Sequence, residues 1–240
     1  MEPEQALEKI TGWLRQLYDE RLLSLVAYGS AAGGNHRGKR SDLNLLAVLE
    51  QIDTKALELG APAVLWWKQQ GNPPLVMWTR EEWKDSADVF PIEFLDIQVH
   101  HRLLYGENLF ADVPHFPDLH RRQVEHDLRA SVLRLRGSYM VVAKDSKALE
   151  ALMLDSITSL VTLLRHALAA MGEPLEMDKE KVLAAAAVRF QFSPASLQTV
   201  LRARHANARL QGGKLEGLRE LFARYLAAII QVDRGLEANQ

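Results

Sequence analysis

The sequence predicts an α+β domain over residues 1–115 followed by an all-α helical bundle domain over residues 116–240. The first half alternates amphipathic helical patterns with short apolar runs that end at glycine or turn residues. After a linker flanked by Pro114 and Pro117, the apolar residues follow helical spacing alone. A chain of 240 residues is long enough to form two cores of ordinary size.

The elements of the first domain follow from apolar spacing and turn signals. Two long helices are predicted, at residues 3–19 and at 53–70, the second with a break at Gly60-Ala61-Pro62. Four strands are predicted, at residues 22–28, 42–49, 75–78 and 91–99. Asp53 is a candidate helix cap, and Thr79 followed by Glu82 has the capping-box form, which predicts a short helix after the third strand.

The second domain is predicted to contain five helices. Their boundaries are marked by capping residues such as Asp118 and Asp178, by Pro194 after Ser193, and by glycines. The helices are expected at residues 118–142, at 148–171, from 178, from 193 to Gly212-Gly213, and at 214–235.

Composition excludes several classes of protein. With 48% hydrophobic and 25% charged residues, the chain is expected to fold around a packed core rather than stay disordered. No apolar run approaches the roughly 20 residues that a membrane span needs, and the first residues lack signal-peptide features. A cytoplasmic protein without a membrane partner is therefore expected. The absence of cysteine excludes disulfides, thiolate ligands and a cysteine nucleophile.

Charge is distributed unevenly along the chain. Residues 1–117 hold 11 Lys and Arg against 17 Asp and Glu, a balance of −6, whereas residues 118–240 hold 18 against 14, a balance of +4. This asymmetry fits a metal-binding half beside a half that tolerates phosphates. It equally fits two solvated surfaces that differ by chance, and both interpretations stay open.

Two short motifs of the first domain could carry chemistry. Asp42 and Asn44 lie two apart on a predicted strand, so both side chains project from one face, and oxygen ligands suit Mg²⁺. Gly29-Ser30 ends the preceding strand, where the backbone can approach a ligand and exposed amides and the hydroxyl can hold a phosphate. Each motif alone also fits a turn or a local cap.

Together the two motifs resemble the nucleotidyltransferase superfamily, whose pattern is Gly-Ser, a loop, and Asp-x-Asp on a strand, with a third carboxylate on a later strand. Here the match is Tyr28-Gly29-Ser30, ten intervening residues, and Ser41-Asp42-Leu43-Asn44-Leu45-Leu46. The resemblance extends through residues 90–97 and 103–107. It implies a mixed-sheet domain, a helical domain after it, and transfer of a nucleoside monophosphate from a nucleoside triphosphate to an acceptor hydroxyl with release of pyrophosphate.

The resemblance also implies roles for individual residues. Asp42, Asn44 and Glu93 would hold Mg²⁺, with Mn²⁺ as a substitute, and Glu93 would alternatively take the proton of the acceptor. The candidate phosphate-binding residues are Gly29, Ser30, Arg37 and Lys39, the last two equally explained as a solvated basic loop. Asp96 is held in reserve, because strand alternation would place it on the face opposite Glu93.

Asn44 departs from the superfamily pattern, which has a second Asp at this position. The neutral amide adds no charge, so a non-catalytic protein that binds a nucleotide or a partner is the rival hypothesis. A third hypothesis is a ribonuclease or toxin-type helical domain, suggested by Arg121 and His126, whose spacing resembles the HEPN ribonuclease motif; an exposed basic helical turn explains this pair better. The acceptor stays open among a small molecule, a protein and a nucleic acid, and a homodimer also stays open.

Overall fold

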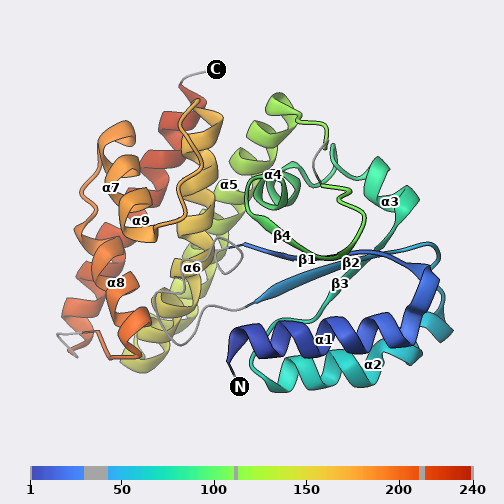
Figure 1. Cartoon of the computed structure of the whole chain (residues 1–240). Coiled ribbons are helices and arrows are strands. Elements are labelled where there is room, and N and C mark those ends of the chain that lie inside the picture. Colours follow the sequence, from blue (N-terminus) through green and yellow to red (C-terminus); the bar gives the residue numbers. More distant parts are fainter. Residues whose placement is uncertain (1, 30–42, 111–112, 211–213, 239–240) are drawn as a thin grey trace. The chain divides into compact units, whose positions relative to one another are not determined.

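The computed structural model describes residues 2–29, 43–110, 113–210 and 214–238 (Figure 1). The chain divides into two compact units, Met1–Phe116 and Pro117–Gln240. Helices and strands alternate in the first unit, whereas the described residues of the second unit form helices and their connections. The predicted α+β fold class with a following helical domain is confirmed.

The first unit is built on a mixed sheet. Its described strands are β1 (Leu22–Tyr28), β2 (Asn44–Leu49), β3 (Val76–Thr79) and β4 (His101–Gly106), in the order β3-β2-β1-β4. Strand β1 pairs antiparallel with both β2 and β4, and β2 pairs parallel with β3. The strands β1 and β2 are therefore central, and both are buried along most of their length.

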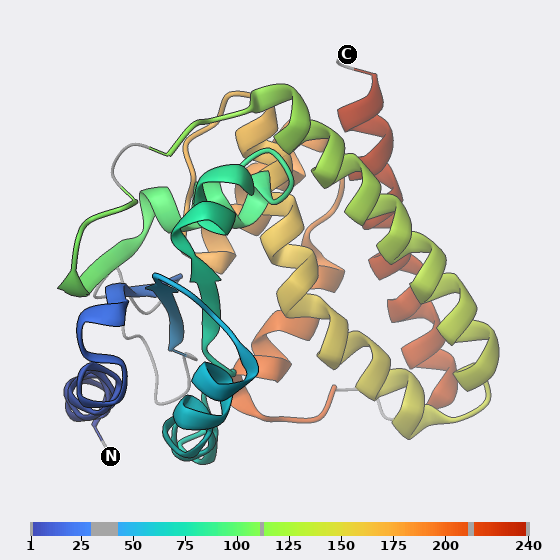
Figure 2. The same ribbon diagram turned by 90° about the vertical axis from the view of Figure 1, so that its right-hand side faces the viewer.

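Helices cover both faces of this sheet. The long helices α1 (Pro3–Tyr18) and α2 (Thr54–Gln69) lie together on one face, while α3 (Arg80–Asp85) and α4 (Pro91–Val99) lie on the other (Figures 1 and 2). A short 3₁₀ turn, Asp19–Arg21, connects α1 to β1. The capping box predicted for Thr79 and Glu82 is present at the start of α3.

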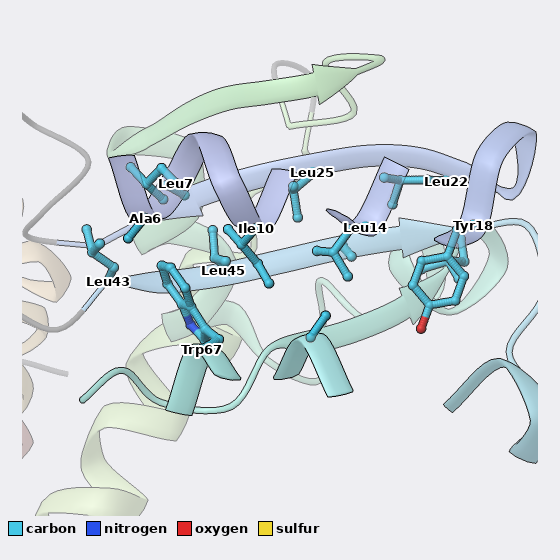
Figure 3. Close-up of a cluster of buried hydrophobic side chains, with 14 of the residues drawn as sticks. Ala6, Leu7, Ile10, Leu14, Tyr18, Leu22, Leu25, Leu43, Leu45 and Trp67 are labelled. Atoms are coloured by element: carbon cyan, nitrogen blue, oxygen red, sulfur yellow. The ribbon is translucent and has the colours of Figure 1, made fainter. Parts of the chain in front are cut away.

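The face covered by α1 and α2 has an apolar core. Strand alternation sends Leu43, Leu45 and Ala47 to this face, where they meet α1 and the buried Trp67 of α2 (Figure 3). Tyr18 closes the core at the far end of α1. Burial of these side chains supplies much of the free energy that holds both helices on the sheet.

The face covered by α3 and α4 has a second, aromatic core. Val26 and Leu46 of the strands pack there against Trp83 and Phe94, whose rings stack with their centroids 4.2 Å apart. Phe110, which follows β4, closes this core, and its ring centroid lies 4.5 Å from that of Trp83. The aromatic contacts fix α3 and α4 against the sheet.

Residues 91–99 form the helix α4 rather than the predicted fourth strand, which lies instead at His101–Gly106. The segment is apolar and short, and apolar periodicity does not separate a strand from a buried helix in a run of this length. Pro91 occupies the first helical turn, where its missing N–H costs nothing. The strand prediction for residues 91–99 is therefore wrong.

Helix α2 runs without the break predicted at Gly60-Ala61-Pro62. It begins as predicted at Asp53, whose side chain accepts a hydrogen bond from the amide of Ala56 at 2.7 Å. Gly60 serves helix packing instead of a turn, because a Cβ there would clash with the Tyr18 hydroxyl. That hydroxyl donates to the Ala56 carbonyl at 2.8 Å and so ties α1 to α2.

The second unit is an all-helical bundle in its described residues. Its helices are α5 (Pro117–Val142), α6 (Ser146–Ala170), α7 (Lys179–Phe190), α8 (Ala195–Ala206) and α9 (Leu215–Glu237). Asp178 caps α7 as expected, whereas α8 ends at Ala206, where Asn207 adopts a left-handed conformation, and not at the later glycines. Within the described parts of both units, no helix is long and apolar enough to span a membrane.

Candidate nucleotide site

Polar groups meet at one end of the central strands, where β1 ends and β2 begins. Tyr28 is paired with Asn44 on one side and with His101 on the other. Because Leu43 and Leu45 enter the first core, alternation places Asn44 on the opposite face, which α4 covers. Tyr28 faces the same way, since it packs against the second core.

Gly29 lets the backbone turn tightly at this end of the sheet. Its φ of 82° lies in the left-handed region, and its amide donates to the carbonyl of His100 at 3.1 Å. A Cβ added here would lie 3.0 Å from the Nδ2 atom of Asn44. Gly29 and Asn44 are thus direct neighbours, and the missing side chain leaves a small cradle between them.

Helix α4 brings two carboxylates to the same place. Burial raises the pKa of the Tyr28 hydroxyl, and the negative charges of Glu93 and Asp96 raise this pKa further. The amide of His100 donates to the carbonyl of Asp96 at 2.9 Å, and the carbonyl of His100 accepts from Gly29, so the end of α4 that carries Asp96 adjoins this turn. Glu93 is exposed to solvent, and Asp96 is half-buried.

The helical conformation of residues 91–99 corrects the prediction that strand alternation would place Glu93 and Asp96 on opposite faces, so that only one of them could join the site. On a helix, residues three apart lie on the same side. Because α4 is a helix, the two carboxylates project from the same side of it. Asp96 is thus a site candidate together with Glu93, not only in its place.

The remaining predicted site residues, Ser30, Arg37, Lys39 and Asp42, lie outside the described residues. In the described part of the chain, no group of three or more His, Asp and Glu side chains could hold a metal ion. Of the three predicted metal ligands, Asn44 and Glu93 belong to the described residues and Asp42 does not.

Sequence reasoning missed Tyr28 as a functional candidate, although it immediately precedes Gly29 in the quoted motif. His101, the first residue of β4, makes two structural contacts. Its Nδ1 lies 2.8 Å from the carbonyl of Ile97, and its Nε2 lies 3.2 Å from Oδ1 of Asn108. These contacts tie the end of α4 to β4.

The spacing of Arg121 and His126 in α5 does not produce a joint site. Arg121 binds the Glu125 carboxylate at 3.2 Å and donates to the carbonyl of Leu236. His126 is exposed and lies 2.8 Å from Asp127. Five helical positions correspond to a rotation of about 140°, so the two side chains point in different directions.

The fold has a counterpart among solved structures. The chain is similar to the spectinomycin adenyltransferase AAD(9) from Enterococcus faecialis, solved with ATP and spectinomycin, with a TM-score of 0.61 and 14% identity. The match covers 93% of this chain and 99% of the adenyltransferase. The chain has the nucleotidyltransferase fold. Neither a known sequence family nor a curated protein sequence matches it.

The nucleotidyltransferase fold agrees with the resemblance predicted from residues 28–46. That prediction depended on a few residues in the first half of the chain, whereas the structural match extends over nearly the whole chain. At 14% identity the match concerns the fold alone, and the chemistry depends on the residues of this chain.

Proposed function

We propose that this protein is a Mg²⁺-dependent nucleotidyltransferase, which moves a nucleoside monophosphate from a nucleoside triphosphate to an acceptor hydroxyl. The observation that carries the proposal is the match, over 93% of the chain, to an adenyltransferase solved with ATP. The contact between Gly29 and Asn44 at one end of the sheet supports it, as does the hydrogen bond that joins Gly29 to His100 at the end of α4. Gly29, Asn44 and Glu93 of α4 are the described members of the residue set that the sequence pattern predicts.

The proposed reaction exchanges one phosphorus–oxygen bond for another. The acceptor oxygen bonds to the α-phosphorus as the bond from that phosphorus to the bridging oxygen breaks, and pyrophosphate leaves. Glu93 takes the proton that the acceptor hydroxyl loses. Its exposed carboxylate at the first turn of α4 suits it to meet an acceptor that arrives from solvent.

Phosphate binding is assigned to the turn after β1. The cradle beside Gly29 lets phosphate oxygens approach the backbone, where a side chain would exclude them. Ser30 follows directly and would donate its hydroxyl, and Arg37 and Lys39 would balance phosphate charge. These groups act by positioning the triphosphate for in-line transfer.

The donor set fits Mg²⁺. The carboxylate of Asp42 and the amide oxygen of Asn44 are hard oxygen ligands, and Asn44 borders the cradle at Gly29. The Glu93 carboxylate would complete this set only in the alternative in which it does not take the proton of the acceptor. When bound, the ion supplies positive charge that neutralises the phosphate oxygens, and Mn²⁺ would serve similarly. Alternation turns the Asn44 side chain toward the α4 face, because its neighbours Leu43 and Leu45 enter the opposite core.

Asn44 also favours a second candidate, a protein that binds a nucleotide without turning it over. The superfamily pattern has a carboxylate where this chain has a neutral amide, and a weaker metal site could bind substrate without catalysing transfer. The two candidates share the binding step and differ in pyrophosphate release.

The test incubates the purified protein with each labelled nucleoside triphosphate, Mg²⁺ or Mn²⁺, and a cell extract or a panel of hydroxyl-bearing small molecules. A labelled product with metal-dependent pyrophosphate release is expected for the enzyme. Metal-dependent binding with no pyrophosphate from any acceptor would establish the binder instead. If no triphosphate binds, both candidates are wrong.

A further inference from the structure

We propose that Asp96 supplies the negative charge that Asn44 lacks, so that two carboxylates of α4 act in the nucleotide site. The proposal rests on the proposed function, because it assigns a residue to that same site. It divides the work between the two side chains: Glu93 meets the acceptor, and Asp96 balances the charge of the metal ion.

The first support is the position of Asp96 on α4. Glu93 and Asp96 are three residues apart in one continuous helix, which places them on neighbouring turns of the same side. Phe94 and Ile97, which alternate with them, are buried in the second core and fix the rotation of the helix. The carboxylates therefore cannot turn away from the sheet end without removing these side chains from the core.

The second support is Tyr28, which links α4 to Asn44. Tyr28 is the cross-strand partner of Asn44, and opposite residues in antiparallel strands have Cβ atoms about 5 Å apart. The Tyr28 ring packs against the core that contains Phe94 and Ile97. Gly29, the next residue, donates its amide to the carbonyl of His100, and the amide of His100 donates to the carbonyl of Asp96. The last turn of α4, which carries Asp96, and the side chain of Asn44 therefore both adjoin Gly29.

The third support is burial, which distinguishes the two carboxylates. A charge acts more strongly on a nearby ion where protein replaces water, because the effective dielectric constant is lower. Asp96 is half-buried and Glu93 is exposed. The Asp96 charge is consequently screened less, which suits a fixed counter-charge, while the exposed Glu93 suits a group that must exchange a proton.

The decisive variant is Asp96→Asn, which removes the charge and keeps the shape. Titration calorimetry with ATP, with and without Mg²⁺, measures its effect on binding. With Mg²⁺ we expect affinity for ATP to fall by roughly tenfold or more. Without metal we expect unchanged or tighter binding, because one negative charge near the triphosphate is gone. A purely structural loss would weaken both.

Two further variants make the test specific. Asp88→Asn removes an exposed carboxylate of the same unit, three residues before the start of α4, and should leave both affinities unchanged. The double variant Asp96→Asn with Asn44→Asp returns the charge from the neighbouring strand and should restore Mg²⁺-dependent binding. Rescue also answers the objection that Asp96→Asn merely misfolds, since a folding defect would persist in the double variant.

The outcomes separate the inference from the function that it assumes. If ATP binding by the wild-type protein does not depend on metal, the inference is overturned along with the proposed metal site. Weaker metal-free binding by Asp96→Asn would then show a structural role for Asp96. If wild-type binding depends on Mg²⁺ and Asp96→Asn keeps that dependence, only the inference fails and the proposed function stands. If the double variant does not regain affinity for ATP in the presence of Mg²⁺, the proposal that Asp96 supplies the charge missing at Asn44 is likewise overturned.

Discussion

The two faces of the sheet differ most at the end where β1 stops and β2 starts. On the face covered by α1 and α2, apolar packing continues to this end, with Leu43 and Leu45 beside Trp67 (Figure 3). On the face covered by α3 and α4, Tyr28 and Asn44 lie at the same end with the carboxylates of α4 nearby.

This contrast arises from the strand itself. Alternation makes Leu43 and Leu45 core residues and turns Asn44, between them, toward α4. The start of β2 therefore contributes residues to the apolar core on one face and a residue of the candidate site on the other. Substitutions on the first face should change stability without changing the chemistry, and substitutions on the second should do the reverse.

The largest effect is expected on the second face, from Glu93→Gln. Removing the proposed proton acceptor should lower kcat by roughly a hundredfold to ten-thousandfold, the usual contribution of a general base. The melting temperature should hardly change, because Glu93 is exposed. Pyrophosphate release and thermal unfolding measured on the same preparation check both parts, and full activity in the variant would remove Glu93 from the reaction.

The matching change on the first face is Trp67→Ala. Trp67 is fully buried, so its truncation should lower the free energy of unfolding by about 3–5 kcal/mol. Urea unfolding can be followed by fluorescence of the other four tryptophans, because all five lie in residues 1–116. Trp66→Ala, at a half-buried neighbour, should cost less. Protein that stays folded should bind nucleotide as before, and selective loss of binding would contradict the separation of the two faces.

Local patterns predicted the features of the first unit that local physics decides. Asp53 caps α2 and Thr79 forms a capping box because the side chains and amides involved are three residues apart. Gly29 ends β1 at a positive φ, which the sequence signals directly. The nucleotidyltransferase fold, by contrast, was predicted from the resemblance of residues 28–46 to the superfamily pattern.

Tertiary context decided the features that the sequence did not predict. The strand order β3-β2-β1-β4 brings His101–Gly106 beside β1. The residues around β1 contain no local pattern that predicts this pairing. Residues 91–99 are apolar enough for a strand but pack as a helix on the aromatic core. That one difference changes the site, since a strand would separate Glu93 from Asp96 and the helix unites them.

A smaller effect is expected from Gly29→Val. This change separates the stability lost through backbone strain from any loss of nucleotide binding at the turn after β1. Valine disfavours a φ of 82°, and its Cβ would press against Asn44 Nδ2 at 3.0 Å. Gly71→Val is the matched control, because Gly71 has a φ of 91° but no atom within 4 Å of an added Cβ.

Both glycine variants should lose about 1–3 kcal/mol of stability through backbone strain. Only Gly29→Val should also weaken nucleotide binding, by roughly tenfold or more if the lost contact is worth as much as a charge-assisted hydrogen bond. Calorimetry with the bound triphosphate measures this difference. Equal affinities in the two variants would mean that phosphates do not approach the turn after β1.

The smallest effect is expected from Asn44→Asp, which restores the paired carboxylates of the superfamily pattern. The change adds a full negative charge beside the Gly29 cradle without altering the shape of the side chain. Without metal, this charge repels Glu93 and Asp96, so the melting temperature should fall slightly. Added Mg²⁺ should reverse the loss, because the ion attracts the same carboxylates.

For the enzyme, the Mg²⁺ concentration that half-saturates pyrophosphate release should fall by roughly tenfold or less in Asn44→Asp, since Asp96 already supplies part of the charge. For a protein that only binds, metal affinity should rise with no turnover. A metal titration monitored by both melting temperature and pyrophosphate distinguishes these results. If neither quantity responds to Mg²⁺ differently from wild type, Asn44 does not face a metal ion, and its position beside Gly29 serves the turn alone.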